Sequence, residues 1–377
     1  MALLWADGFD HYGTSTTSRT NMLLGVYAQV QNTMGASTTN PRNGICSLTN
    51  AFADAANSLR RVFGGTKGTG GNYVGVGGAF YLTQLPSVND AIMLMSFNDA
   101  ANLPNIALFC QSDGTLTVKA HSAYSAFSSW LAANSPTVLG SSSTPAFFAG
   151  SWNHIEMKAT FHNTTGRVYV YANGVNVIDT GAGGVDTVST NFSGVSNAVE
   201  ASQVEFMRCN SSSVLPWYMD DIFAWDHTGS YNNDVIGDKD VLPYYYDGDG
   251  ATVQWVRNTG SNDYEMVDET VQDGDTTYLQ ASNASDVQEF TLGGIPSTVS
   301  DIVAVVLVNL MRKTQAGACN VRADIVETGG SASTGTDNEM TEEYQYWHDV
   351  VERNPAGSAQ WTYTTLNDSK LRLTRTT

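Results

Sequence analysis

Residues 152–180 read WNHIEMKATFHNTTGRVYVYANGVNVIDT, and the pattern of this stretch predicts the fold of the first part of the chain. From residue 154 to 161 polar and apolar side chains alternate with a period of two, which is typical of a strand with one buried face. A turn at 163–166 leads to a second alternating run, and Asn173-Gly174 supplies the two positive φ angles of a type I′ hairpin turn. Three antiparallel strands are therefore expected. Their predicted core side chains are Trp152, Ile155, Met157, Val168 and Val170.

The composition favours an all-β protein with several domains. The chain has 377 residues, only 15% of them charged, and 35 glycines. Lysine and arginine number 18 against 37 acidic residues, a net charge of −19. Nucleic acids and anionic membranes bind basic surfaces, so neither is an expected partner. The longest apolar run, 302–311, is too short to span a bilayer, and the acidic start 7–10 does not fit a secretory signal.

Two stretches resemble the central hairpins of concanavalin A-like (laminin G-like) jelly rolls. GSWNHI at 150–155 is similar to the G-x-W-x-H strand of that family, and 166–174 is similar to the strand that ends in Tyr-x-Asn-Gly. The segment WYMDDIFAWD at 217–226 is similar to the closing strand of such domains. The resemblance implies an antiparallel jelly-roll sandwich over residues 1–228. Alternation and acidic turns after it predict a second antiparallel β-sandwich over 229–377, for docking or oligomerisation.

A series of segments along most of the chain resembles a family of tailed-bacteriophage virion proteins. The segments are DGFDHY (7–12), YMDDI (218–222), NND (232–234), GD (237–238), DGDG (247–250), Trp255, Tyr264, VDE (267–269), DGD (273–275), Tyr278, 303–313, WT (361–362) and LN (366–367). The resemblance implies a structural protein of the virion, made in the host cytoplasm. It does not separate head from tail.

The function expected from these resemblances is non-enzymatic and tail-associated, of the fibre or baseplate type, with a contribution to host attachment. The expected partners are other virion proteins, a second and third copy of the chain in a homotrimer, and a glycan of the host surface. Two alternatives stay open. The first is a capsid decoration, cement or head-fibre protein, and the second is a glycan depolymerase.

No enzymatic motif is present in the sequence. It lacks the E-x-D-x-x-E strand of the glycoside hydrolases of this fold, the GxSxG elbow and the HExxH helix. Glu156 alternates with His154 and Lys158 and is expected in a solvent-facing ion pair. Asp220 and Asp221 are neighbours in a predicted strand, so they point to opposite faces unless a bulge intervenes. We therefore expect no catalytic residues.

Binding sites have only scattered candidates. The predicted sugar-binding aromatic residues are Trp130, Tyr244 and Tyr246, because such rings are apolar with a polar tip. No cofactor is expected, with calcium as the alternative, since carboxylates are its usual ligands. The candidate calcium ligands lie in acidic turns and are Asp247, Asp249, Asp273 and Asp275. The cysteines form no CxxC motif, so no zinc site is predicted.

Overall fold

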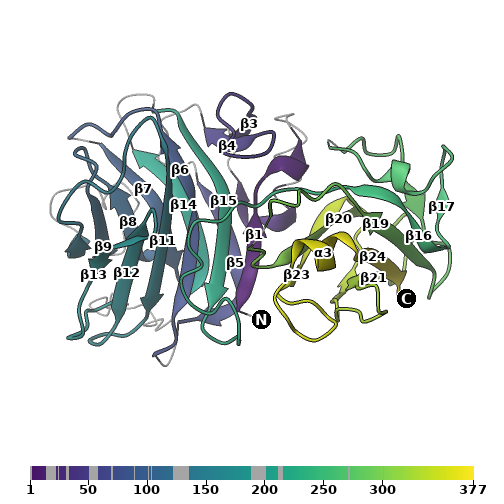
Figure 1. Cartoon of the computed structure of the whole chain (residues 1–377). Coiled ribbons are helices and arrows are strands. Elements are labelled where there is room, and N and C mark those ends of the chain that lie inside the picture. The colour runs from purple at the N-terminus through teal and green to yellow at the C-terminus, as the bar shows by residue number, and fades with distance from the viewer. Residues whose placement is uncertain are drawn as a thin grey trace. The chain divides into compact units, whose positions relative to one another are not determined.

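The chain forms two compact units in the computed structural model (Figure 1). The first comprises Met1–Phe9 and Thr14–Val241, and the second comprises Asp10–Gly13 and Leu242–Thr377. The structure describes residues 2–13, 23, 25–30, 34–50, 58–68, 71–88, 90–100, 102, 104–121, 136–187, 201–210, 215–270, 272–299 and 301–377.

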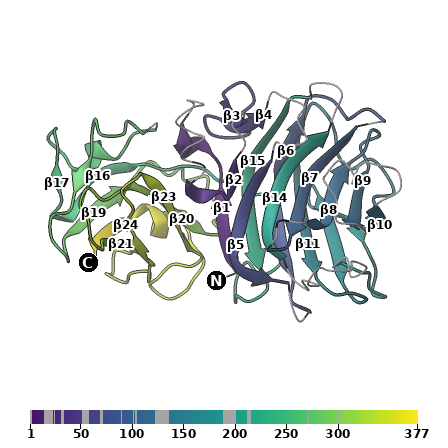
Figure 2. The same cartoon turned by 180° about the vertical axis from the view of Figure 1, so that it is seen from behind.

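Two antiparallel sheets build the first unit, and Figures 1 and 2 show one in front of the other from opposite sides. Sheet A has the order β13 (Val175–Asp179), β12 (Arg167–Ala172), β11 (Trp152–Thr160), β6 (Val74–Leu82), β15 (Trp217–Asp226), β4 (Ser47–Asn50), β3 (Met34–Ser37), with β1 (Leu3–Asp7) also paired to β15. Sheet B has the order β10 (Pro136–Ser141), β9 (Leu116–His121), β8 (Pro104–Cys110), β7 (Ala91–Asn98), β14 (Ala201–Asn210), β5 (Leu59–Lys67), β2 (Gln29–Val30).

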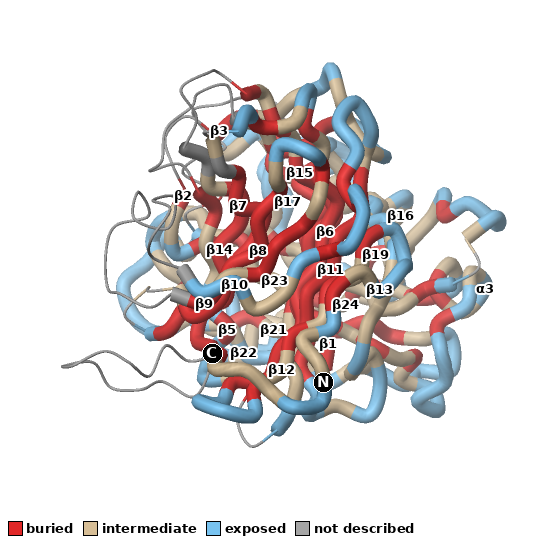
Figure 3. Tube along the Cα trace, turned by 90° about the vertical axis from the view of Figure 1, so that its left-hand side faces the viewer, coloured by how far each residue is buried: buried red, intermediate tan, exposed pale blue. Residues whose placement is uncertain are grey.

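The core of this unit lies between the two sheets. Ile155 and Met157 on β11 and Val168 and Val170 on β12 are fully buried, which confirms the predicted inward faces of both strands. Figure 3 shows the strands of both sheets as buried and many of the turns between them as exposed. Trp152 is the exception among the predicted core residues. It is only half-buried, because it lies on the same face of β11 as His154 and Glu156 and not on the face of Ile155.

Glycines on β6 make room for large rings on the outer face of sheet A. Gly75 pairs with Trp225 of β15 and Gly77 pairs with Phe223. A Cβ atom on Gly75 would lie 2.0 Å from Cε2 of Trp225, and one on Gly77 would lie 2.5 Å from Cζ of Phe223. The glycine-rich segment 64–78 is thus strand at both ends, in β5 and β6.

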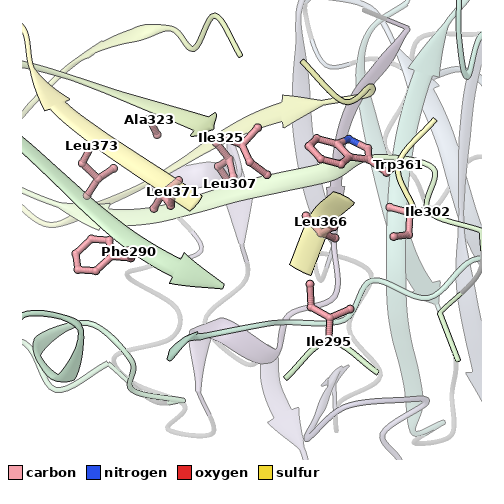
Figure 4. Close-up of a cluster of buried hydrophobic side chains, with 10 residues drawn as sticks. All are labelled: Phe290, Ile295, Ile302, Leu307, Ala323, Ile325, Trp361, Leu366, Leu371 and Leu373. Carbon is pink, nitrogen blue, oxygen red and sulfur yellow. The ribbon is translucent and has the colours of Figure 1, made fainter. Parts of the chain in front are cut away.

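The second unit is also an antiparallel β-structure, so the predicted all-β fold class is confirmed for both parts of the chain. Its main sheet has the order β16 (Tyr246–Val253), β19 (Val287–Leu292), β24 (Lys370–Arg375), β21 (Asn320–Val326), β22 (Asp337–Glu339). Two further pairs are β20 (Val305–Met311) with β23 (Gln345–Val351) and β17 (Val256–Arg257) with β18 (Leu279–Gln280). Figure 4 shows the core cluster between these elements, which includes Phe290, Leu307, Ile325 and Trp361.

Three short helices lie in the second unit. The 3-10 helices η1 (Asp10–Tyr12) and η3 (Tyr264–Met266) and the α-helix α3 (Tyr363–Asn367) are single turns. Thr362 caps α3 with a reciprocal pair of hydrogen bonds to Thr365, which satisfies backbone donors at the helix start. Within the described part of the chain, no helix has the length and apolar character needed to cross a membrane.

Gly75→Ala should destabilise the first unit by about 1–3 kcal/mol, because the added methyl group overlaps the Trp225 ring in a packed layer. Urea unfolding followed by tryptophan fluorescence measures the change. Gly183→Ala is the matched control, since a Cβ atom there would have no neighbour within 4 Å. Equal unfolding midpoints for the two variants would show that the packing of the Trp225 ring on Gly75 does not contribute to stability.

Candidate functional site

Three aromatic side chains form a row across the outer face of sheet A. Trp152 of β11 pairs directly with Tyr81 of β6, and Tyr81 pairs with Tyr218 of β15. The ring centroids of Trp152 and Tyr81 are 5.7 Å apart, and those of Tyr81 and Tyr218 are 5.6 Å apart. All three side chains are half-buried. This aromatic row therefore presents ring surface to solvent on three adjacent strands.

A β-bulge lies next to the row on β15. Asp220 pairs with Ala79 and Phe223 pairs with Gly77, so β15 has one residue more than β6 over this interval. Asp221 takes up the extra residue in a left-handed conformation with φ of 50°. At the bulge, the carboxylates of Asp220 and Asp221 both contact Arg42. A bulge is the one exception to the expectation that Asp220 and Asp221 point to opposite faces, and β15 contains it.

Arg42 joins these carboxylates to the segment after β15. Its Nη1 atom donates to Asp221 Oδ2 at 2.7 Å and to the carbonyl oxygen of Lys239 at 3.2 Å, and its Nη2 atom donates to Asp238. The backbone N–H of Arg42 donates to Asp220 Oδ2 at 3.4 Å. Arg42 is thus the counter-ion of the buried carboxylate of Asp221 and of the exposed carboxylate of Asp238.

Residues 234–241, which we call the strap, are tied to the outer face of sheet A through Glu156. Oε1 of Glu156 accepts hydrogen bonds from Trp225 Nε1 at 2.7 Å and from the N–H of Ile236 at 3.0 Å. Oε2 accepts from the N–H of Gly237 at 2.9 Å. Glu156 is fully buried as a result. The predicted solvent-facing ion pair of Glu156 is therefore wrong, because backbone donors of a distant segment cover this carboxylate.

The two ends of the strap have further anchors. Lys158 Nζ donates to Asp234 Oδ1 at 2.5 Å and lies 4.9–5.0 Å from the ring centroids of Tyr73 and Tyr169. At the other end, the N–H of Val241 donates to Asp221 Oδ1 at 2.7 Å. The strap thus belongs to the first compact unit up to Val241. The domain boundary predicted at 228/229 stays a prediction about independent folding.

Burial moves two of these carboxyl groups toward neutrality. It raises the pKa of Glu156 to about 7, against the opposing effect of its three N–H donors. It likewise raises the pKa of Asp221 to about 7, although the N–H of Val241 and the charge of Arg42 favour the ionised form. Both groups can therefore take up or release a proton near neutral pH.

His154 lies between the aromatic row and Glu156 on β11. Its side chain is 3% exposed, and neither ring nitrogen has a hydrogen-bond partner among the described residues. The imidazole stacks on Phe223 with centroids 5.9 Å apart. Burial lowers the pKa of His154 to about 4, with Arg42 acting in the same direction and Asp238 opposing it. At neutral pH this imidazole is uncharged and is a proton acceptor without a partner.

The outer face of sheet A therefore combines the parts of an acid–base site. The neutral imidazole of His154 on β11 and the carboxyl group of Asp220 on β15 lie on either side of Ala79 of β6, and Asp221, whose carboxyl group has a pKa near 7, follows Asp220 in the bulge. The half-exposed aromatic row flanks them. The sequence did not predict this set, because the contacts of Asp220 and Asp221 with Arg42 require a bulge and the burial of His154 depends on residues that are distant along the chain.

The predicted sugar-binding residues lie elsewhere or outside the described part. Trp130 falls among the residues that the structure does not describe. Tyr246 stacks on Phe290 with centroids 4.7 Å apart, and Tyr244 packs against the core cluster of the second unit. These two tyrosines contribute to the core of that unit and do not form a row.

The four candidate calcium ligands are hydrogen-bonded separately in the second unit. Asp247 accepts from Thr291, Asp249 accepts from the N–H groups of Asp263 and Tyr264, Asp273 accepts from Thr277, and Asp275 accepts from Arg312 and Tyr344. Among the described residues, no three His, Cys, Asp or Glu side chains form a group that could hold a metal ion. Calcium binding stays a prediction that no observation supports.

Solved structures with a similar fold are known, whereas the sequence matches no family model and no curated protein. The cellulose-induced protein Cip1 is 15% identical with a TM-score of 0.38, over 55% of this chain and 88% of that chain. A carbohydrate esterase of the Shiga toxin-encoding bacteriophage phi24B is 12% identical with a TM-score of 0.38, over 59% and 97% of the two chains. The alginate lyase A1-II′ of polysaccharide lyase family 7 is 14% identical with a TM-score of 0.35, over 52% and 83%.

These similar structures correct two expectations from the sequence. A non-enzymatic, tail-associated virion protein and the expected lack of enzymatic activity are both contradicted, because the similar structures include an esterase, alginate lyases and a sialidase. The capsid decoration alternative falls with them. The resemblance to bacteriophage proteins stays a prediction. The expected partners, trimer, cofactor and location stay predictions.

Glu156→Gln should change the pH dependence of stability. A carboxyl group whose pKa is raised in the folded state binds its proton more tightly there, so the free energy of unfolding falls as pH rises from about 4.5 to about 7. Relative to the glutamine variant, the wild type should lose roughly 3 kcal/mol over this interval. Urea unfolding of both proteins at several pH values measures it. A difference that stays constant from pH 4.5 to 7.5 would show that Glu156 is ionised throughout.

Proposed function

We propose that the first unit processes carbohydrate, with the glycan bound along the aromatic row and the reaction at His154. The observation that carries the proposal is the position of a buried, uncharged and unpartnered imidazole beside three half-exposed aromatic rings on adjacent strands. Apolar faces of sugar rings stack on such side chains, and the polar tips of Tyr and Trp reach their hydroxyl groups. This is the depolymerase alternative of the sequence analysis, placed on residues that the sequence did not single out.

The roles of the residues follow from their protonation. His154 is uncharged at neutral pH and accepts a proton from water, from a hydroxyl group or from a carbon acid of the sugar. Asp221 has a pKa near 7 and is suited to return a proton to a leaving group. Glu156 is fully hydrogen-bonded and positions Trp225 and the strap. Because His154 is buried, reaction there requires a local movement that exposes the imidazole.

Incubation of the purified chain with defined polysaccharides and bacterial surface glycans tests the proposal. Release of reducing ends reports glycosidic hydrolysis, an ultraviolet-absorbing unsaturated product reports elimination, and released acetate reports ester hydrolysis. His154→Ala should slow turnover roughly 100-fold or more, since general base catalysis is removed. Trp152→Ala should weaken glycan binding about tenfold.

Tyr278→Ala is the matched control, because Tyr278 is a similarly exposed aromatic residue of the second unit, outside the row. Its activity should equal that of the wild type. Turnover that is unchanged in His154→Ala, or the absence of all three products on every glycan tested, would refute the proposed function.

A further inference from the structure

The charges around the aromatic row are dominated by carboxylates. Asp220 is the next residue on the same face of β15 after Tyr218, so the two are separated by about 7 Å along the strand. The acidic residues of β11, β15 and the strap are Glu156, Asp220, Asp221, Asp226, Asp234, Asp238 and Asp240. The basic residues of the same elements are Lys158 and Lys239. Asp226 pairs with Val74 and points away from the outer face, and Glu156 and Asp221 are partly protonated near pH 7. The remaining carboxylates still outnumber the two amino groups, so the outer face carries an excess of negative charge.

Three cations that contact this face are already paired with carboxylates. Arg42 forms ion pairs with Asp221 at 2.7 Å, with Asp238, and with Asp240 at 3.5 Å. Lys158 is paired with Asp234 at 2.5 Å. Arg167, at the far end of β12, is held by both carboxylate oxygens of Asp179. A ligand carboxylate could gain Arg42 or Lys158 only by displacing a partner that is already in place.

We infer that the aromatic row takes uncharged glycans and discriminates against uronate-containing or sulfated chains. The inference rests on the proposed function and specifies its substrate class. The screening length is about 8 Å at physiological ionic strength, so an acidic sugar on Tyr218 lies within the field of Asp220. The strap carboxylates Asp238 and Asp240 gather beside Asp220, because both are paired with Arg42. An uncharged sugar that stacks on the rings experiences no such repulsion.

The substrate class also restricts the chemistry. Elimination breaks the bond at C4 of a uronate after a base removes the proton at C5, and the neighbouring carboxyl group of the sugar makes that proton acidic. A neutral hexose has neither this carboxyl group nor its ester. On such a sugar the reaction at His154 is therefore hydrolysis. The imidazole takes a proton from water and the water oxygen bonds to the attacked carbon of a glycosidic or ester linkage. The bond between that carbon and the leaving oxygen breaks, and the proton goes to the leaving oxygen.

Binding of matched oligosaccharides to the full chain tests the inference. Uronate oligosaccharides and their methyl esters share one backbone and differ in charge, and neutral hexose oligosaccharides extend the series. At low salt the esters and neutral chains should bind at least about tenfold more tightly than the free uronates, and added salt should reduce the difference. Trp152→Ala should weaken all binding that occurs on the row.

Asp240→Asn removes one strap charge and keeps an oxygen that can accept the hydrogen bond from Asn43. It should strengthen uronate binding severalfold and leave ester binding unchanged. Asp113→Asn, which removes the same charge from an exposed turn between β8 and β9, should change neither. Tighter Trp152-dependent binding of free uronates would overturn the inference and leave the proposed function standing. Binding that does not depend on Trp152, or no binding of any glycan, would overturn both.

Discussion

The hydrogen bonds of Glu156 are the interaction on which the organisation of sheet A depends. One carboxylate satisfies the indole N–H of Trp225 on β15 and two backbone N–H groups of the strap. Removing such an acceptor would leave three buried donors unpaired, each at a cost of about 1–3 kcal/mol. The carboxylate itself is costly to bury, as its raised pKa shows. The buried carboxylate of Glu156 is maintained because other contacts hold its three N–H donors in position.

Those contacts extend the interaction across the whole outer face. The ring of Trp225 lies on Gly75, and the ring of Phe223 on Gly77 supports the imidazole of His154. The bulge at Asp221 supplies the second anchor, through Arg42 and the N–H of Val241. The strap is therefore held at both ends, and the polar middle of the sheet is buried although it lies on the outside of the sandwich.

The same arrangement divides the outer face into a covered part and an open part. His154, Glu156 and Asp220 are buried, whereas the aromatic row one step along the strands remains half-exposed. The proposed glycan binding on the aromatic row and the proposed reaction at His154 thus lie at neighbouring positions of one sheet. The acidic surroundings of the row come from side chains that have structural partners, so the charge that selects a ligand is a consequence of how the strap is held.

The sequence by itself determined the antiparallel all-β class, the inward faces of β11 and β12, and the Asn173-Gly174 hairpin, because alternation and turn chemistry depend on neighbouring residues. The sequence could not place Trp152. This residue stands next to an apolar run, as a core residue would, but its register with Tyr81 puts it on the outer face of sheet A. Only the tertiary structure decided that Asp220 and Asp221 both contact Arg42, since one extra residue in β15 forms a bulge there. It also decided the burial of Glu156, because the donors at Ile236 and Gly237 are 80 and 81 residues away along the chain.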